Sequence, residues 1–448
     1  MQSVTPPLPS TFCARLVRDL GEAEAAPLCR ALNRPEAATV SVRLNPLKAA
    51  AVPDGAAPVP WCAGGYRLKE RPDFTGDPLL HAGCYYVQEA ASMGVALAYE
   101  AMAEKPRLLL DLCAAPGGKS TLWRSLMPEG TLLVANEPVR QRAMVLRENL
   151  QKWGHPDVMV CMSAPADFAR LPGLFDAIAT DVPCSGEGMF RKDHNARSEW
   201  SEENAAMCAA RQRKILSDVW PALREGGYLV YSTCTFNPAE NEENVAWACR
   251  ELGAEIVPLQ APEGVGITEH EGALKFLPHR TIGEGFFLAL LRKTAPLATL
   301  RLRKVEKCVG LPRGWLQEER HFAGLLQKDG TLCALRATLL PATTAIRAAT
   351  HTIATGVETA VPKGREWRPA HALALCTSLK PDAFPRAELS RTDALQYLSR
   401  QAVTLSPSVP RGHVIACYDG HPLGFLNNLG TRANNLYPAG WRIRRALC

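Results

Sequence analysis

Two cysteines in the sequence follow apolar runs that are typical of buried parallel strands. Cys184 comes three residues after FDAIATD, and Cys234 comes directly after YLVYST. Asp181 is the last residue of the first run. Because ligands bind at the carboxyl ends of parallel strands, we expect both thiols and the carboxylate of Asp181 to face one pocket. Thiols in such a place can act as nucleophiles.

A glycine turn follows another apolar run, in LLLDLCAAPGGKS at residues 108–120. Gly117 and Gly118 let the backbone approach a bound ligand, and the N-terminus of the following helix faces that ligand. The dinucleotide fingerprint GxGxxG is absent, which argues against a nicotinamide cofactor. The next predicted strand ends in ANEP, so Glu137 stands where an acidic side chain binds ribose hydroxyls. Together these features favour S-adenosylmethionine as the cofactor.

A methyl donor beside two thiols suggests methyl transfer to carbon 5 of a pyrimidine. That carbon is a poor nucleophile until a thiolate adds to carbon 6. One cysteine could add and the other could help with the elimination, and the spacing alone leaves these two roles open. Asp181 could hydrogen-bond or protonate ring nitrogen 3, where charge develops.

Strands and helices alternate from about residue 105 to residue 293, which predicts an α/β, Rossmann-like, doubly wound parallel sheet. The last run, FFLALLRK, suits the extra strand that methyltransferase sheets carry beside the last parallel one. Asn237, Pro238 and Glu240 have the spacing of a capping box, so we expect a helix to begin there, directly after the Cys234 loop. The expected strands are 107–112, 131–136, 157–161, 175–181, 226–233 and 286–293.

The segments on either side of this region predict smaller domains. Residues 12–33 look helical and TVSVRLN looks like a strand, so a small α/β region comes first. Residues 81–102 look like one amphipathic helix that leads into the sheet. After Lys293 the alternation is lost, and β-rich segments predict one or two small mixed domains.

Composition describes a globular protein with no metal centre. At 448 residues the chain is long enough for two or three domains. We find no apolar run long enough to span a bilayer and no signal peptide, so we expect a cytoplasmic protein and no membrane partner. The fifteen cysteines include no CxxC pair and no Cys/His cluster with zinc spacing, which excludes an obvious metal site or disulfide framework. We expect a monomer.

The positive charge of the chain belongs to its C-terminal third. Residues 294–448 contain 21 Lys and Arg against 10 Asp and Glu, a net charge of +11, whereas the whole chain carries +6. Such a region is expected where a protein meets a polyanion. Arg191 and Lys192 could reach RNA phosphates, and Trp315, Trp367 and Trp441 could stack on bases.

Three motifs, DLCAAPGGKST, DVPCSGEGMFRKD and YSTCTFNPAENEENV, resemble those of the RNA cytosine-5 methyltransferases of the RsmB/NOP/Sun type. The resemblance covers residues 80–293, SVRLNPLK is similar to the family's N-terminal RNA-binding region, and HPLGFLNNLGTRANNLYPAGWRIR is similar to the PUA-like ending of the bacterial RsmF branch. That branch acts on small-subunit (16S) ribosomal RNA, so the resemblance implies RNA as the substrate. The implied domains are 1–104, N-terminal RNA-binding; 105–293, catalytic; 294–380, linker and small domain; and 381–448, PUA-like.

The resemblance also implies roles for individual residues. Cys234 would be the nucleophile, Cys184 would serve in product release, and Asp181 would lie in the active site beside the cofactor, with Glu137 on the cofactor's ribose. Family members usually have an acidic residue near position 163 or 164, and this chain has Ser163 and Ala164 there. The residues implied to line the cofactor are Cys113, Ala114, Ala115, Pro116, Gly117, Gly118 and Lys119.

Alternative functions remain open at this point. A transfer RNA cytosine-5 methyltransferase would use the same motifs. A DNA cytosine methyltransferase would use Cys184 as the nucleophile. A non-catalytic ribosome assembly factor could retain the fold, although both cysteines, Asp181 and the glycine turn are intact. A dinucleotide-dependent oxidoreductase is disfavoured because the dinucleotide loop is missing.

Overall fold

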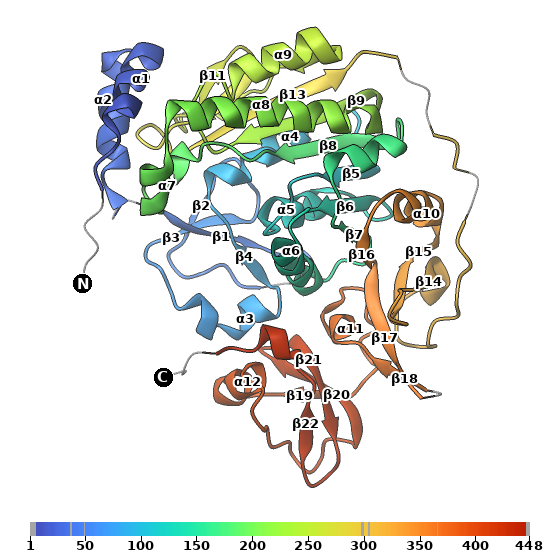
Figure 1. Ribbon diagram of the computed structural model, residues 1–448. Coiled ribbons are helices and arrows are strands. Elements are labelled where there is room, and N and C mark those ends of the chain that lie inside the picture. The colour runs from blue at the N-terminus through green and yellow to red at the C-terminus, as the bar shows by residue number, and fades with distance from the viewer. Residues whose placement is uncertain are drawn as a thin grey trace.

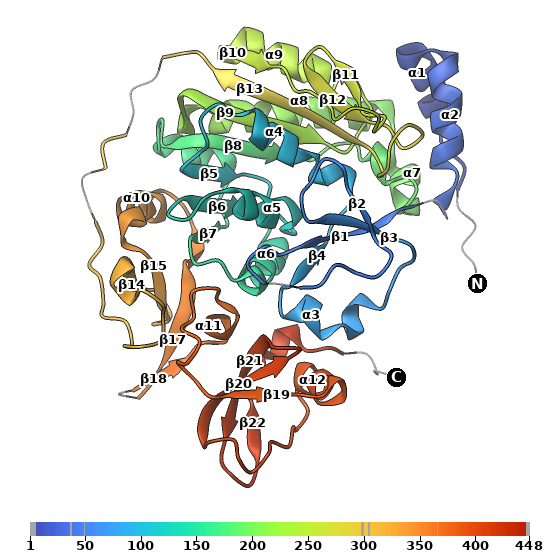
Figure 2. The same cartoon turned by 180° about the vertical axis from the view of Figure 1, so that it is seen from behind.

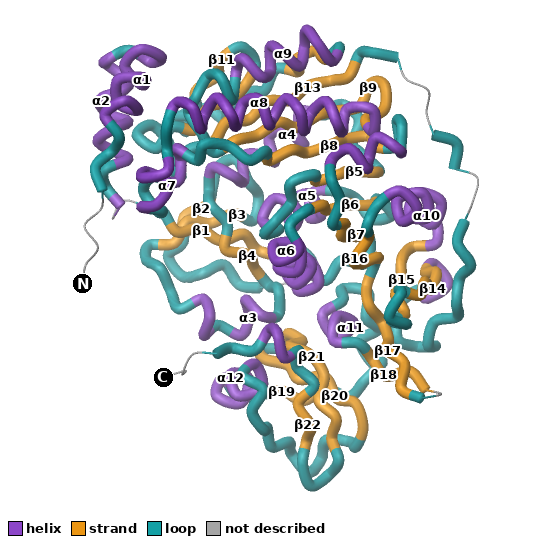
Figure 3. The backbone as a smooth tube through the Cα atoms, in the orientation of Figure 1, coloured by secondary structure: helices purple, strands orange, loops and turns teal. Residues whose placement is uncertain are grey.

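A central sheet lies between an N-terminal region and two C-terminal units in the computed structural model (Figures 1 and 2). The structure describes residues 6–35, 38–48, 50–296, 300–302, 305–364 and 366–444. The N-terminal hairpin of α1 (Ser10–Leu20) and α2 (Glu22–Leu32) lies at one end of the sheet beside α7 (His194–Glu199). The last unit lies below α3 (Pro78–His81) in both views. Figure 3 shows the strands of the central sheet enclosed by helices.

The central sheet has ten strands in the order β11-β12-β13-β9-β8-β5-β6-β7-β16, with β10 paired to β13. The strands β5 to β9 run parallel to one another. The strand β13 lies beside β9, as the sequence predicted for FFLALLRK, and runs antiparallel to it. The strands are β5 (Leu108–Asp111), β6 (Leu132–Asn136), β7 (Val158–Cys161), β8 (Phe175–Asp181), β9 (Leu223–Thr233), β10 (Ala254–Val257), β11 (Thr268–His270), β12 (Ala273–Phe276), β13 (Phe286–Lys293) and β16 (Thr352–Thr355).

Helices bury both faces of this sheet, which is why its strands read as continuous apolar runs. Leu109 of β5 packs in the same cluster as Trp123 and Leu146, whereas its neighbour Leu110 packs on the other face with Leu216 and other residues. The α/β Rossmann-like prediction is therefore confirmed. The helices that cover the sheet are α4 (Val95–Ala101), α5 (Gly118–Leu126), α6 (Arg140–Trp153), α8 (Glu202–Val219) and α9 (Glu242–Leu252).

The N-terminal region is a helical hairpin followed by a small sheet. Gly21, with a φ of 78°, separates α1 (Ser10–Leu20) from α2 (Glu22–Leu32), so the predicted helical segment is two helices. The sheet order is β2-β3-β1-β4, with β1 (Val40–Leu44), β2 (Ala57–Pro58), β3 (Gly65–Leu68) and β4 (Tyr85–Val87). The short helix α3 (Pro78–His81) precedes β4 in the chain and lies beside it.

The prediction of one amphipathic helix over residues 81–102 was wrong. Tyr85–Val87 form the edge strand β4, which pairs antiparallel with β1. A 3-10 turn at Ala91–Gly94 then leads into the short helix α4. Backbone pairing with a distant strand outweighed the local helical pattern here, because the sheet satisfies the same backbone hydrogen-bonding groups as a helix would.

Two four-stranded sheets follow the central sheet. The first has the order β14-β15-β17-β18, and the second, in the last unit, has the order β19-β20-β21-β22. Between β15 and β17 in sequence, β16 joins the central sheet antiparallel to β7, which the sequence did not predict. Their elements are β14 (Phe322–Leu326), β15 (Leu332–Arg336), α10 (Leu340–Ala349), β17 (Val357–Lys363), β18 (Glu366–Pro369), α11 (His371–Leu375), β19 (Arg386–Glu388), α12 (Arg391–Leu398), β20 (Gly412–Tyr418), β21 (His421–Asn428) and β22 (Ala433–Asn435).

The residues that the structure describes lack two kinds of feature. Within those residues, none of the helices has the length and apolar character needed to cross a membrane. The same part of the chain contains no group of three or more His, Cys, Asp or Glu side chains arranged to hold a metal ion.

Candidate active site

The thiols of Cys184 and Cys234 meet at the carboxyl edge of the central sheet. Cys184 lies in the loop after β8 and Cys234 directly follows β9, and these strands are parallel neighbours with Asp181 opposite Ser232. The two Sγ atoms are 3.2 Å apart. Both residues are partly exposed, so a substrate can reach them.

The two thiols differ in their environment. The hydrogen bond to Cys234, followed by burial and the nearby charge of Glu240, raises the pKa of the Cys184 thiol well above its usual range. Cys184 therefore holds its proton and shares it with Cys234 as a hydrogen bond. A thiol acts as a nucleophile in its thiolate form, and the protonated Cys184 is the neighbour that can donate a hydrogen bond to Cys234.

Backbone and side-chain bonds hold Cys234 in place. The N–H of Gly188, in the Cys184 loop, donates to the carbonyl oxygen of Cys234 at 2.8 Å. Asn241 bonds to both flanking residues, because its Oδ1 accepts from Thr233 Oγ1 at 2.6 Å and its Nδ2 donates to the carbonyl of Thr235 at 3.0 Å. The loop that carries Cys234 is therefore anchored on both sides.

Asp181 forms an ion pair at the same edge of the sheet. Lys119 Nζ lies 2.8 Å from Asp181 Oδ2, and Ser232 Oγ donates to Asp181 Oδ1 at 3.0 Å. Burial by itself lowers the pKa of Lys119, but the charge and hydrogen bond of Asp181 outweigh it, so the pKa is raised and the side chain stays a cation. The Lys119 ammonium also lies 5.0 Å from the centroid of the Phe286 ring. Sequence reasoning placed Lys119 in the cofactor loop, whereas its side chain extends toward Asp181.

A second carboxyl group lies behind this pair. Asp111 ends β5, is 1% exposed and accepts a hydrogen bond from Ser120 Oγ at 2.6 Å. Burial raises the pKa of Asp111 to about 7, and the hydrogen bond from Ser120 opposes that rise. Burial also raises the pKa of Cys113, so this third thiol near the site stays protonated.

The turn between β5 and α5 has the form that a bound nucleoside needs. Gly117 precedes α5 with a φ of 116°, a conformation that side-chain-bearing residues rarely adopt. The carbonyl of Pro116 accepts from Asn149 Nδ2 at 2.8 Å and that of Ala115 accepts from Arg142 Nη2 at 3.2 Å, which ties the turn to α6. The residues from Cys113 to Lys119 thus form a fixed turn at the N-terminus of a helix, and such a turn binds ligands through its backbone N–H groups.

The end of β6 supplies the acidic residue beside this turn. Glu137 is 2% exposed; it accepts from the N–H of Val139 at 2.9 Å and pairs with Arg142 at 3.1 Å. The donor set, a glycine turn at a helix N-terminus with a fixed carboxylate one strand away, fits the adenosine of S-adenosylmethionine. Glu137 is the residue that would hold the ribose.

The segment after β7 is bound to the end of β6. Asn136, fully buried, accepts from the N–H of Ser163 and donates to its carbonyl at 3.0 Å each. Asp167 accepts from the N–H of Ala164 at 3.1 Å. An acidic side chain is thus present near the expected position, but it is bonded to the backbone of its own turn, and the third cofactor contact stays a prediction.

The capping box predicted at Asn237 and Glu240 was wrong. The helix α9 begins at Glu242, because the N–H of Asn237 is bonded to Thr235 Oγ1 and the Glu240 carboxylate bonds to Ser185 in the other cysteine loop. Sequence reasoning therefore missed Glu240 as a residue of the site. The only signal in the sequence was a carboxylate close to Cys234, and its spacing from Asn237 matched that of a capping box.

Some of the expected RNA contacts are contradicted by the packing. Arg191 is buried and its Nε lies 2.6 Å from Glu284 Oε2, so it does not face RNA; Lys192 is partly exposed. Trp315 and Trp441 are partly buried in hydrophobic clusters. Trp367 on β18 is 37% exposed, and it alone of the three tryptophans presents an exposed ring.

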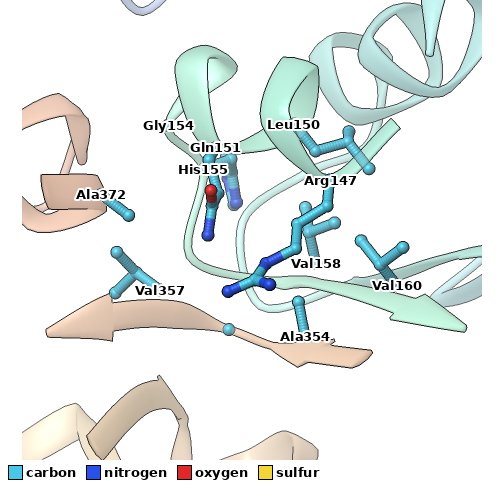
Figure 4. A pocket seen from close by; sticks show the side chains of 11 residues that line it. Arg147, Leu150, Gln151, Gly154, His155, Val158, Val160, Ala354, Val357 and Ala372 are labelled. Carbon is cyan, nitrogen blue, oxygen red and sulfur yellow. The ribbon is translucent and has the colours of Figure 1, made fainter. Parts of the chain in front are cut away.

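Figure 4 shows a pocket that lies away from the cysteines. It sits between α6, β7 and the β16–β17 segment and has a volume of about 20 Å³, room for one water molecule. Its walls are mostly apolar, and the guanidinium of Arg147 in it forms an ion pair with Glu358. We interpret it as a gap where β16 joins the sheet and not as a substrate site.

Comparisons with known proteins agree with this geometry. Residues 99–292 match the model of the 16S rRNA methyltransferase RsmB/F family. Residues 8–90 match the N-terminal domain of 16S rRNA methyltransferase RsmF, and residues 384–443 match the methyltransferase RsmF PUA domain. The three matches follow the N-terminal region, the central sheet and the last four-stranded sheet.

Curated relatives match over most of the chain. Ribosomal RNA small subunit methyltransferase F of Cronobacter sakazakii is 33% identical over 408 residues, which cover 85% of this chain and 83% of that protein. The protein of the same name in Escherichia coli O157:H7 is 32% identical over 418 residues, covering 85% and 84%.

Solved structures show the same fold. A methyltransferase homolog protein from Pyrococcus horikoshii is 28% identical with a TM-score of 0.54, covering 63% of this chain and 94% of that one. NSun6 from Pyrococcus horikoshii has a TM-score of 0.55 at 19% identity, covering 65% and 100%. The chain therefore belongs to the RsmB/F family of 16S rRNA methyltransferases and is an enzyme, an S-adenosylmethionine-dependent methyltransferase.

Proposed function

We propose that this enzyme methylates carbon 5 of cytidine in small-subunit ribosomal RNA, with Cys234 as the nucleophile and Cys184 as the residue that serves product release. The observation that carries the proposal is the pair of thiols 3.2 Å apart, beside Asp181 and the glycine turn. A methyltransferase that acts on an oxygen or an exocyclic nitrogen needs no thiol pair. Addition to a pyrimidine ring needs one thiol as the nucleophile, and a second thiol can act as the base in the elimination that follows.

Cys234 begins the reaction by adding to carbon 6 of the cytosine. Its sulfur forms a bond to that carbon, and the ring electrons move toward carbon 5 and nitrogen 3. Asp181, fixed by Lys119 and Ser232, is the group that stabilises nitrogen 3, where charge develops. The addition makes carbon 5 electron-rich, which methyl transfer to that carbon requires. Bound S-adenosylmethionine supplies the electrophilic methyl group.

Release requires loss of the carbon 5 proton and cleavage of the Cys234–carbon 6 bond. The hydrogen bond to Cys234 is the first cause of the raised pKa of Cys184. Once Cys234 is a thioether that cause is gone, so the pKa of Cys184 falls and the thiol can give up its proton to solvent, which reaches this partly exposed residue. Cys184 can then take the carbon 5 proton as a base while the ring double bond reforms and Cys234 leaves as a thiolate.

The proposal that ribosomal RNA is the substrate rests on the names of the chain's relatives and on its net charge. The relatives reported above are named small-subunit ribosomal RNA methyltransferases, and residues 384–443 match an RsmF PUA domain. The net charge of +11 over residues 294–448 suits a polyanion. We propose that the enzyme works in the cytoplasm as a monomer without a metal ion, and that the domains divide at residues 104, 293 and 380.

Bisulfite sequencing of ribosomal and transfer RNA, from cells with and without the gene, tests the substrate. The proposal expects at least one 16S cytidine to lose methylation in the deletion strain and to regain it with the wild-type gene but not with Cys234→Ala. Loss of methylation confined to transfer RNA would show that the substrate is transfer RNA and not ribosomal RNA. No loss at any cytidine, together with no binding of S-adenosylmethionine in a titration, would favour the non-catalytic assembly factor.

A further inference from the structure

Two buried carboxylates connect the loops that carry the two cysteines. Glu240 and Glu187 are both fully buried, at 0% exposure, and neither was among the residues expected to act. Each belongs to one cysteine loop and bonds to the other. Burying a carboxylate costs free energy unless several hydrogen-bond donors compensate for it. The donors of these two carboxylates therefore show what each residue does beside the thiols.

Glu240 extends from the Cys234 side to the Cys184 side. Its Oε2 accepts from the N–H of Ser185, the residue after Cys184, at 2.9 Å, and from Gln212 Nε2 at 2.9 Å. Its Oε1 accepts from the Ser185 hydroxyl. That hydroxyl lies 2.9 Å from Thr235 Oγ1, which follows Cys234. Burial raises the pKa of Glu240, and the bonds from Ser185 oppose the rise.

Glu187 makes the reverse connection. It lies three residues after Cys184, and its Oε2 accepts from the N–H of Phe236, two residues after Cys234, at 3.0 Å. Its Oε1 accepts from Trp200 Nε1 at 3.0 Å and from Arg15 Nη2 at 2.8 Å. Arg15 is itself buried and belongs to α1, so the N-terminal hairpin takes part in this connection.

The two connections cross between the loops in opposite directions. The Ser185 contact ties the residue next to Cys184, and the Phe236 contact ties the segment just beyond Cys234. We propose that Glu187 and Glu240 are positioning residues that hold the two thiols at reacting distance, and that Arg15 extends this control to the N-terminal hairpin. The inference rests on the proposed function for its consequence in catalysis, because product release needs both sulfurs at one substrate ring.

Disulfide formation in the RNA-free enzyme measures the thiol separation without any methyl transfer. Diamide takes up the two thiol hydrogen atoms as it is reduced to a hydrazine, while the Sγ atoms form a bond. Peptide mapping by mass spectrometry follows the Cys184–Cys234 cross-link. Mapping is needed because Cys13 and Cys29 also lie 3.7 Å apart.

Four variants make the test specific. Glu240→Leu removes every acceptor for Ser185 and Gln212 at similar volume. Glu240→Gln keeps an acceptor for the Ser185 N–H, because the Ser185 hydroxyl can turn and accept from the amide, so it is the conservative rescue. Glu187→Gln places an NH₂ group against donors that cannot turn. Glu243→Leu, an exposed position on α9, is the matched control.

We expect the cross-link to form about tenfold more slowly in Glu240→Leu and Glu187→Gln, and at the wild-type rate in Glu240→Gln and Glu243→Leu. With RNA, the first two variants should lose kcat, keep KM for RNA within about twofold and accumulate a covalent adduct. Circular dichroism and S-adenosylmethionine affinity check that each variant folds. If Glu240→Leu does not fold, the cross-linking rate and product release of Glu187→Gln test the inference.

A folded Glu187→Gln enzyme that cross-links and releases product at wild-type rates overturns the inference. Failure of the proposed function looks different. In that case Cys184→Ala forms no RNA adduct, while the cross-link rates of the four variants still report on the two carboxylates.

Discussion

Single residues in this site have protonation states that their neighbours determine. Cys184 keeps its proton because it bonds to Cys234, and Lys119 stays charged because it pairs with Asp181. Asp111 is the clearest case, since burial raises its pKa to about 7. In each case burial or a bonded neighbour determines whether the group carries its charge.

The raised pKa of Asp111 predicts a pH dependence of stability. The folded state holds a proton that the unfolded state releases near pH 4, so the free energy of unfolding falls as pH rises from about 4 to about 7 and then levels off. Asp111→Asn removes this titration, so the stability of the variant relative to wild type should rise over that range by up to about 4 kcal/mol. Urea unfolding at a series of pH values measures it. Parallel curves for the two proteins would contradict the buried, titrating carboxyl.

Elements position the site through a close approach of two loops. The 3-10 turn at Glu187–Met189 packs against the segment after β9, and a Cβ built on Gly188 would lie 2.8 Å from the carbonyl oxygen of Cys234 and 3.0 Å from that of Gly285. Both neighbours are backbone, which cannot give way as a flexible side chain does. A glycine is therefore required at this point of the turn.

Gly188→Ala should push the Cys184 loop away from Cys234. We expect methyl transfer to RNA to fall by about tenfold or more while S-adenosylmethionine affinity is unchanged. Gly310→Ala is the control, because a Cβ there meets no atom within 4 Å. Equal activity of the two variants would mean that the loop separation does not matter for the reaction.

The sequence was sufficient for the elements whose signal is local. The parallel strands were predicted because each is a short apolar run. The strands β4 and β16 were missed because their partners, β1 and β7, are distant in sequence. The roles of Glu187, Glu240 and Arg15 depend on partners 49, 55 and 172 residues away, and no spacing reveals such pairs.

The whole molecule places its basic surface on the C-terminal units. Lys363, Trp367 and Arg368 are exposed together on the β17–β18 hairpin, where Val361 pairs with Arg368 and Pro362 with Trp367. The last unit packs against the N-terminal region, since Arg391 donates to the carbonyl of Gly76 at 2.9 Å. The last unit is therefore joined to the region that also contacts the cysteine loops.

The cations of the β17–β18 hairpin should contribute to the salt dependence of RNA binding. If Lys363 and Arg368 meet phosphates, the double change to Ala lowers the slope of log Kd against log salt by about 1.5. Lys214→Ala with Arg250→Ala, two exposed cations on α8 and α9, should leave the slope as it is. Fluorescence anisotropy with a labelled RNA across a salt series gives both values. Equal slopes for wild type and the hairpin variant would remove the hairpin from the RNA surface.

The central claim is that Cys234 attacks the ring and Cys184 serves release. Incubation of Cys184→Ala with RNA and S-adenosylmethionine, followed by denaturing electrophoresis and mass spectrometry, tests it directly. The account predicts a covalent RNA adduct on the peptide that contains Cys234, and no adduct in Cys234→Ala. An adduct on Cys184, or normal turnover by Cys234→Ala, would contradict it.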